Sequence, residues 1–289
     1  MSQPSEALGR VESAQRLQKV LATLGLGSRR GIEQWIVDGR ITLNGRRAEL
    51  GARVLATDDV RLDGQRIDLR PALVLKGANP IGSAATHGSD IPAHAATAIQ
   101  TEVLGYHKPV GEVTTRHDPQ GRPTVFDHLP APRAGRWIVI GRLDVNTSGL
   151  LLFTNDGELA HRLMHPSSQI EREYLVRVRE EPSSAALMRL RHGVELDDGP
   201  AHFETVMRVG TSSEDSHSWF RVSLREGRNR EVRRLWQAVG HEVSRLKRLR
   251  YGPVSLPEDL RPAEARRLPL SLISALQTAV SGSPKFVRP

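Results

Sequence analysis

Apolar positions near the start of the chain recur at the spacing of a helix. The first predicted helix follows Gln15 and carries Leu17 and Leu21 on one face, and Gly25 ends it. A second helix is predicted over 29–37, with Ser28 as its N-cap. Short strands at 41–43, 54 and 60–62 follow, and the turn signals between them are Asn44-Gly45 and Asp63-Gly64. Residues 15–70 therefore predict a small α+β unit.

Two segments lack this periodicity. Residues 1–14 are polar and predict a disordered start. Residues 71–100 are dominated by Ala, Gly, Pro, His and Ser, which predicts a flexible linker. A structured insertion is the less favoured alternative for the second segment.

From Val103 onward, alternating apolar runs predict a larger domain. Its strand-like runs are 102–106, 137–143, 149–154, 172–178, 203–209 and 219–224, and its helices are predicted over 158–164, 183–191 and 230–239. Because the helices interrupt the strands irregularly, we predict a mostly antiparallel mixed sheet with flanking helices. We place this domain at 101–252. Residues 253–289 predict a basic, Pro-rich tail with one short helix over 268–280.

Composition narrows the class of partner. Among the 289 residues, 41 Lys and Arg oppose 33 Asp and Glu, a net charge of +8. This excess favours a polyanionic partner because arginine binds phosphate in a bidentate manner, although a charge of this size also serves solubility. The absence of cysteine excludes disulfides, thiolate catalysis and Cys-bound zinc. With no signal-peptide core and no long apolar run, we expect a soluble, cytoplasmic protein.

The amino-terminal unit is rich in cations. Arg29 and Arg30 stand at a predicted helix N-terminus, where free N–H groups and the helix dipole already favour an anion. The order of helix, Gly-x-Gly, Ser-Arg-Arg, helix, Asp-Gly-Arg and a strand that ends in Asn-Gly resembles the S4 RNA-binding domain over residues 15–70. The resemblance implies recognition of helical RNA by shape and phosphate. The RNA contacts it implies are Arg16, Lys19, Arg29, Arg30, Arg40, Asn44 and Arg46.

The most informative stretch of the larger domain is 141–157. It places Asp144 between the apolar runs 137–140 and 149–153. An Asp followed by Asn or Ser is usually a turn former that bonds its own backbone. The stretch nevertheless resembles the signature motif of RsuA/RluB-type pseudouridine synthases, in which the matching Asp is catalytic.

Three further segments resemble the same family in the same order. They are 106–111, 171–174 and 226–235, so the resemblance covers about 103–252. It implies isomerisation of a uridine to pseudouridine in ribosomal RNA. No metal or organic cofactor is implied, because substrate and product are isomers. Residues 229–236 most resemble the RluB branch, which modifies 23S rRNA, and a 16S rRNA target is the alternative within the family.

The resemblance also assigns roles to side chains. Asp144 acts either as a nucleophile or as a base that removes a ribose proton. Arg233 is expected to lie beside Asp144 and keep it ionised. Tyr174 is expected to stack on the target base with its hydroxyl near C5, although its strand pattern alone favours a core position.

Further cations are expected to bind RNA. Lys108 is expected to shape the site and contact phosphate, and Arg142 to hold phosphate when the target base leaves its helix. The other RNA contacts expected near the third motif are Arg228, Arg230 and Arg234. A strand with Arg245 and Lys247 on its exposed side, and Arg248 as a further candidate, predicts a second phosphate track along the wall of the catalytic cleft.

Other functions have weaker support. His161 and His165 stand four residues apart, but without a third ligand we expect no metal site. A metal-dependent nuclease would need clustered carboxylates around Asp144. The remaining alternative is a non-catalytic rRNA-binding assembly factor. We therefore expect a monomeric enzyme whose partner is ribosomal RNA, from 23S rRNA or a large-subunit precursor, with no membrane and no small-molecule cofactor.

Overall fold

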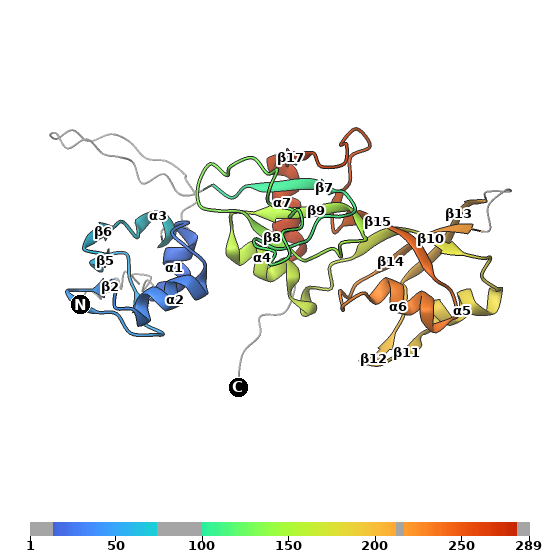
Figure 1. The fold of residues 1–289 in the computed structure, drawn as a ribbon, viewed down its shortest axis with the longest axis horizontal. Helices are drawn as coiled ribbons and strands as arrows, with labels where there is room; N and C mark the ends of the chain where they lie inside the picture. The colour runs from blue at the N-terminus through green and yellow to red at the C-terminus, as the bar shows by residue number, and fades with distance from the viewer. Residues whose placement is uncertain (1–13, 74–99, 212–216, 282–289) are drawn as a thin grey trace, which may run out of the picture. The chain divides into compact units, whose positions relative to one another are not determined.

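The computed structural model describes residues 14–73, 100–211 and 217–281. They fall into two compact units, of which the first contains 14–73 and the second contains 101–131 and 137–281 (Figure 1). Of the predicted disordered start 1–14, only residue 14 is described, and 74–99 of the predicted linker also lie outside the described residues. The helix α3 (Arg70–Leu73) takes up the first residues assigned to that linker.

The first unit is the predicted small α+β fold. It contains the helices α1 (Leu17–Thr23) and α2 (Arg29–Val37) and an antiparallel sheet of β3 (Arg46–Arg47), β2 (Ile41–Leu43), β5 (Val60–Leu62) and β6 (Gln65–Ile67), while β1 (Gln15–Arg16) pairs with β4 (Arg53–Val54). Apolar faces of the helices and strands meet in one core that includes Leu21, Ile32 and Ile41. The Ser28 hydroxyl accepts a hydrogen bond from the Gly31 amide, as its predicted N-cap role requires.

Both predicted tight turns of this unit are confirmed. Asn44 and Gly45 have φ values of 52° and 77°, and Asp63 and Gly64 have 50° and 81°. Two successive residues with positive φ are the signature of the type I′ turn, whose twist matches that of the strands it joins. The local sequence therefore determines the register of both hairpins.

The second unit is built on a mixed sheet of nine described strands. Its main order is β13 (Thr205–Thr211), β14 (His217–Leu224), β10 (Arg172–Arg179), β15 (Val243–Tyr251), β9 (Ser148–Thr154), β7 (Val103–Lys108) and β17 (Ala265–Arg267), while β8 (Ile138–Ile140) pairs with β9 and β16 (Val254–Ser255) with β15. The pairing of β9 with β15 is parallel and the others in this sheet are antiparallel. The predicted mostly antiparallel mixed sheet is confirmed.

Helices cover the two faces of this sheet at opposite ends (Figure 1). On one face α4 (Gly157–Met164) and α7 (Leu270–Ala279) pack over β7 and β9. On the other face α5 (Ser184–His192) and α6 (Glu231–Ala238) pack over β10 and β14, beside the hairpin of β11 (Val194–Leu196) and β12 (Gly199–Ala201). β9 serves both cores, because Leu150 and Leu152 face one side and Leu151 and Phe153 the other.

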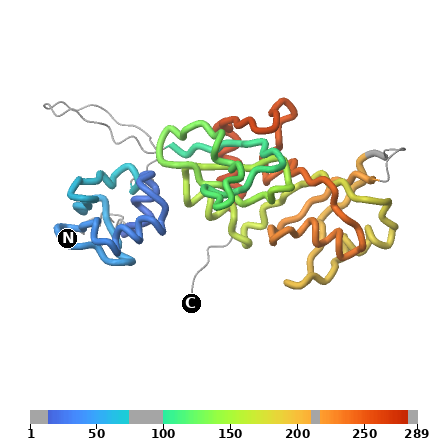
Figure 2. Tube along the Cα trace, viewed as in Figure 1, coloured from blue at the N-terminus to red at the C-terminus, as the bar shows by residue number. Residues whose placement is uncertain are grey.

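The short helix predicted over 268–280 is confirmed as α7, but the rest of the described part of 253–289 is not the predicted tail, because it packs into the second unit. β17 pairs with β7, and Ile273 and Leu276 of α7 are buried in the core that α4 completes. Figure 2 shows the red carboxyl-terminal segment running beside the green segment that contains β7. The short, Arg-rich strand β17 has no apolar alternation of its own. Its pairing depends on β7, which is about 160 residues earlier in the chain, so local composition could not reveal it.

Gly149 allows β9 to approach β15. Its φ is 108°, and a Cβ built there would lie 2.5 Å from the Arg248 nitrogen and closer still to the Arg248 carbonyl oxygen. Both atoms belong to the backbone, so no side-chain rotation can relieve the collision. The parallel contact between the two halves of the sheet therefore requires glycine at this position.

We expect Gly149→Ala to lower the free energy of unfolding by about 3 kcal/mol or more, because overpacking against backbone adds to the strain of a positive φ. Gly141→Ala is the matched control. Gly141 also has a positive φ, of 76°, but no atom lies within 4 Å of a Cβ placed on it, so we expect a loss of only about 1 kcal/mol. Urea unfolding of both variants measures the difference. Equal losses would contradict the role of the close approach.

Candidate active site

Asp144 lies in the turn that joins β8 to β9, and hydrogen bonds fix the backbone of this turn. Each carbonyl oxygen from residue 143 to residue 147 accepts one. In chain order the donors are the Thr114 hydroxyl (2.8 Å), the Thr147 amide (3.0 Å), the Gly111 amide (2.8 Å), the Arg233 guanidinium (2.9 Å) and the Lys108 ammonium (2.9 Å). The position of the Asp144 Cα is therefore set by groups from several separate segments.

Lys108 lies beneath the turn. Its side chain is fully buried, and Nζ donates to the Pro109 carbonyl at 2.8 Å as well as to Thr147. Burial lowers the pKa of Lys108 to about 8, while the charges of Glu112 and Asp144 act in the opposite direction. A phosphate contact by this buried ammonium is excluded, so that prediction is wrong. The structure gives Lys108 the other predicted role, which is to shape the site.

The carboxylate of Asp144 faces Arg230. The Asp144 Oδ2 atom lies 3.5 Å from Nη1 of Arg230, and the two side chains are 34% and 50% exposed. Arg230 precedes α6 with a φ of 49°, a conformation that non-glycine residues adopt rarely and often at functional sites. The pair leaves the carboxylate accessible from solvent.

Arg233 was expected to lie beside Asp144, and its guanidinium bonds backbone carbonyls of the turn and of β15 rather than the carboxylate. Its Nη1 donates to the Val243 carbonyl and its Nη2 to the Asn146 carbonyl, so the guanidinium holds the turn by its backbone. Burial and the charge of Arg230 lower the pKa of Arg233, and the charge of Asp144 raises it. Arg233 therefore lies close enough to Asp144 for the two charges to interact, without a hydrogen bond between them.

The sequence did not indicate that Arg230 is the arginine that pairs with Asp144, and the reason is geometric. Arg230 and Arg233 are three residues apart at the start of a helix, a spacing that places both on the same side. Arg230 was expected to contact RNA, and Arg233 to contact Asp144. The positive φ of Arg230 turns that residue toward the carboxylate, and no sequence pattern signals such a conformation in an arginine.

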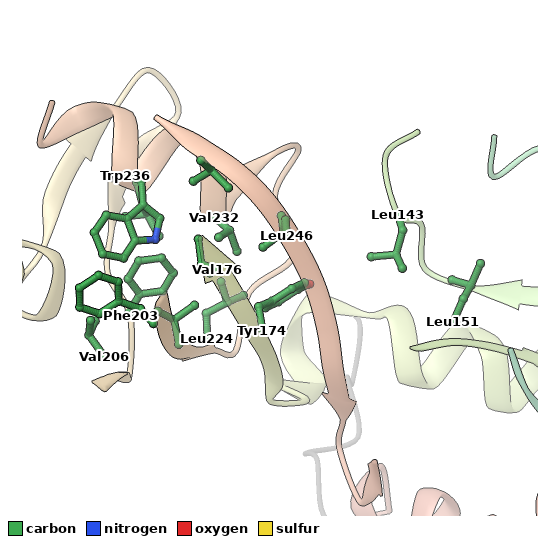
Figure 3. Close-up of a cluster of buried hydrophobic side chains, with 14 of the residues drawn as sticks. Leu143, Leu151, Tyr174, Val176, Phe203, Val206, Leu224, Val232, Trp236 and Leu246 are labelled. Carbon is green, nitrogen blue, oxygen red and sulfur yellow. The ribbon is translucent and has the colours of Figure 1, made fainter. Parts of the chain in front are cut away.

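Tyr174 belongs to the core as much as to the site. It lies on β10, is 9% exposed, and packs in the cluster with Val176, Leu224 and Leu246. Figure 3 shows its ring at the end of the cluster away from Trp236, with its hydroxyl directed toward the side on which Leu143 lies. Within the described part of the chain this hydroxyl has no hydrogen-bond partner. Stacking on a base stays a prediction.

Two arginines predicted to bind RNA are instead occupied within the protein. Arg234 forms a bidentate pair with Asp198, with both distances 2.8 Å, and holds the pKa of Asp198 at about 2. Arg228 donates to the carbonyls of Gly199 and Pro200. Together they attach the start of α6 to the β11–β12 hairpin, and their role in RNA binding stays a prediction. Arg142, by contrast, is exposed.

In the first unit the predicted RNA ligands separate into two groups. Arg29, Arg30 and Arg46 are exposed, and none has an ion pair with another described residue. Arg16 and Arg30 line one concavity beside α1 and α2, and Lys19 of α1 is half-buried.

Arg40 and Asn44 form the second group, because each has a partner within the protein. Arg40 pairs with Asp63 at 2.5 Å and stacks on Trp35. The Asn44 side chain donates to the Asp58 carboxylate and accepts from the Asp59 amide, which connects its turn to the residues before β5. Asn44 is exposed, and its RNA contact stays a prediction.

The three cations of the predicted phosphate track on β15 also differ in exposure. Arg248 is 3% exposed, and its Nε donates to the Leu150 carbonyl, so its prediction as an exposed cation is wrong. Arg245 and Lys247 are not buried. They lie on the face of the sheet opposite Tyr174, because they are opposite Arg177 and Leu175 in the strand register. They therefore do not line the wall of the cleft at Asp144.

The described residues contain no group of three or more His, Asp or Glu that could hold a metal ion. The rings of His161 and His165 lie 5.8 Å apart without a third ligand. In the same part of the chain no helix is long and apolar enough to span a bilayer.

Comparison with known proteins agrees with this arrangement. A family described as RNA pseudouridylate synthase matches residues 102–238, and the S4 domain matches residues 15–60. The chain is 48% identical to ribosomal large subunit pseudouridine synthase B of Escherichia coli (strain K12), over 94% of this chain and 85% of that protein. It is 51% identical to the protein of the same name from Xylella fastidiosa (strain 9a5c), over 91% of this chain and 51% of that protein.

The chain spans about half the length of the curated relatives from Xylella fastidiosa and Xanthomonas campestris. Among solved structures, a crystal structure of pseudouridylate synthase matches with a TM-score of 0.56 and 24% identity, covering 90% of this chain and 99% of that chain. This likeness shows that the two share a fold.

Lys108 makes the stability of the chain depend on pH. Its pKa is about 8 in the folded protein against 10.5 for an unperturbed lysine, so between these values the unfolded chain binds more protons than the folded one. This term therefore raises the free energy of unfolding as pH increases from 8 to 10.5. We expect Lys108→Met to lose this contribution. Urea unfolding of both proteins across that window tests it, and parallel pH profiles would contradict the assignment.

Proposed function

Because the chain belongs to the RNA pseudouridylate synthase family, we propose that it isomerises a uridine of ribosomal RNA to pseudouridine. We propose 23S rRNA as the target. The observation that carries the proposal is the state of Asp144, a partly exposed carboxylate beside Arg230 on a turn whose carbonyls are all held. The names of the relatives, which refer to the large ribosomal subunit, support the choice of RNA.

The reaction needs one ionised carboxylate. The bond between C1′ and N1 of the uridine breaks, the uracil turns, and a bond forms between C1′ and C5. The C5 proton leaves and N1 takes up a proton, so substrate and product are isomers. Asp144 starts this sequence either by attacking C1′ or by removing a proton from the ribose. In both cases Arg230, 3.5 Å away, is the cation that faces the carboxylate.

Other side chains prepare the base. A uridine within helical RNA has to leave its stack before Asp144 reaches the sugar. Arg142 is exposed two residues before Asp144, and we assign it to the phosphate of the displaced nucleotide. Tyr174 offers the edge of its ring and a hydroxyl without a partner among the described residues, which suits a contact near C5.

A non-catalytic RNA-binding factor is the alternative from another class. Such a protein would bind RNA through the first unit and would not need the arrangement around Asp144. Lys108 is fully buried and Arg233 partly buried where they hold the turn, and burial of both cations is unfavourable, a cost that RNA binding through the first unit does not require. This observation favours the enzyme. A monomeric state and a cytoplasmic location remain predictions.

We expect Asp144→Asn to lower turnover by about 10⁴-fold or more, within the range seen when a catalytic side chain is removed. RNA affinity should change little, because Asn keeps the shape and the polar contacts. Tritium release from rRNA labelled at uridine C5 measures turnover, and filter binding measures affinity. Asp197→Asn, at an exposed carboxylate of the same unit, is the control. Turnover by Asp144→Asn at the wild-type rate would refute the proposal.

We expect Arg29→Gln/Arg30→Gln to reduce the slope of log K against log salt by about 2, since each lost phosphate contact removes nearly one unit. The control is Arg61→Gln/Arg70→Gln, which removes the same charge from arginines that Asp59 and Asp68 already pair. Titration of the full chain with 23S rRNA between low and high salt provides both slopes. If the two double variants shift the slope equally, net charge rather than the helix N-terminus governs binding.

A further inference from the structure

One region of the large sheet has no covering element among the described residues. α5 and α6 cover β10 and β14 on the face of Val176, and α4 and α7 cover the opposite face only at β7 and β9. The remaining region is the face that carries Leu175. We call it the back face and define it by Leu175, Arg177, Met207, Trp219, Arg221, Arg245 and Lys247. Met207 is 54% exposed on it.

Strand register places these residues in two rows. Arg177 is opposite Trp219 on one side and Arg245 on the other. Leu175 is opposite Arg221 and Lys247, and Met207 is opposite Arg221. Directly opposite residues of antiparallel strands point to the same face. Each row thus carries two cations and at least one apolar or aromatic side chain.

The cations of the back face outnumber the carboxylates beside them. Arg221 lies 3.4 Å from Glu173, and Arg177 stacks on Trp219 with 5.9 Å between its guanidinium carbon and the ring centroid. Within the described residues Arg245 and Lys247 have neither an ion pair nor a hydrogen bond. Like charges side by side on a sheet are destabilising, so the face is complementary to a polyanion.

A concavity of about 390 Å³ adjoins this face. It lies between the strands and the loop after β16, and its lining includes Arg221 and Lys247 together with Arg250, Glu173 and Glu258. Its volume is at the lower end of the range for small-ligand sites. The back face thus continues into this concavity, because Arg221 and Lys247 belong to both.

We propose that the back face is a second RNA-binding surface, which holds a single-stranded segment of the substrate RNA on the side of the sheet opposite Asp144. Proteins bind single strands through cations that follow the backbone and aromatic rings on which bases stack. Trp219 supplies the ring, and Arg245 with Lys247 supplies cations that no described residue pairs. The inference rests on the proposed function, since it takes ribosomal RNA as the substrate.

The face is separate from the catalytic site. The strands β10 and β15 present Tyr174 and Leu246 to the catalytic side and Leu175 and Lys247 to the back. A short RNA that fills the site at Asp144 therefore does not reach the back face, whereas a long RNA can pass around the edge of the sheet. The proposal consequently predicts a dependence on RNA length.

The test compares two double variants of the full chain. Arg245→Gln/Lys247→Gln removes two back-face cations, and Arg179→Gln/Arg208→Gln removes two cations of the same sheet that Glu242 and Glu181 already pair. With deproteinised 23S rRNA, we expect the first variant to bind about tenfold more weakly and to lose about 1.4 from the salt slope, and the second to change neither. With a short stem–loop that contains the modified uridine, we expect both to turn over at the wild-type rate.

Two results would overturn the inference. Equal affinities and slopes for the two variants would show that the back-face cations do not contact RNA. Unchanged binding to deproteinised 23S rRNA with lost binding to ribosomal precursor particles would assign the face to a protein partner instead. Failure of the wild type to isomerise either RNA would refute the proposed function, and the binding comparison would still decide whether the back face contacts RNA.

Discussion

The site depends on one constraint, which is that the backbone carbonyls of the turn at 143–147 are all occupied. An unpaired buried carbonyl costs about 1–3 kcal/mol. A different backbone path for this turn would leave several carbonyls unpaired, and their costs would add. The donors come from the segment 108–114, from the turn itself and from α6. Local sequence can propose the turn, but only the closed sheet and its helix bring these donors together. The turn therefore reaches its final geometry only when the second unit has folded.

Two of these donors are cations removed from solvent, Lys108 fully and Arg233 in part, so a positive charge in the sequence does not by itself indicate a residue that faces RNA. Lys108 and Arg233 lose hydration on burial, and burial lowers the pKa of each. Hydrogen bonds to the turn carbonyls and the charge of Asp144 offset that cost. Arg228 and Arg234 serve a comparable structural purpose through the β11–β12 hairpin.

The sequence was sufficient to predict the structure wherever that structure depends on neighbouring residues in the chain. The Ser28 cap, the Asn44-Gly45 turn and the alternation in β10 all depend on neighbours in the chain, and each is observed as predicted. It was insufficient where the structure depends on a contact with a residue far away in the chain. β17 is a strand because of β7, and Arg230 rather than Arg233 faces Asp144 because of a backbone angle. The family resemblance drew attention to Asp144, but the partners of its side chain and of its turn could only come from the fold.

The strand β15 connects these observations. Its side chains alternate, so Leu246 enters the core while Arg245 and Lys247 face outward on the other side. In register, Lys247 is opposite Ser148 and Arg248 is opposite Gly149, and these two pairs are the parallel contact between β15 and β9. Ser148 follows directly after the turn that holds Asp144. An RNA segment bound at Lys247 would therefore be separated from the turn at 143–147 by one strand pairing, and it would lie on the other face of the sheet. Because Gly149 leaves no space between the two backbones, a displacement of β15 would be passed to β9 rather than absorbed by side chains.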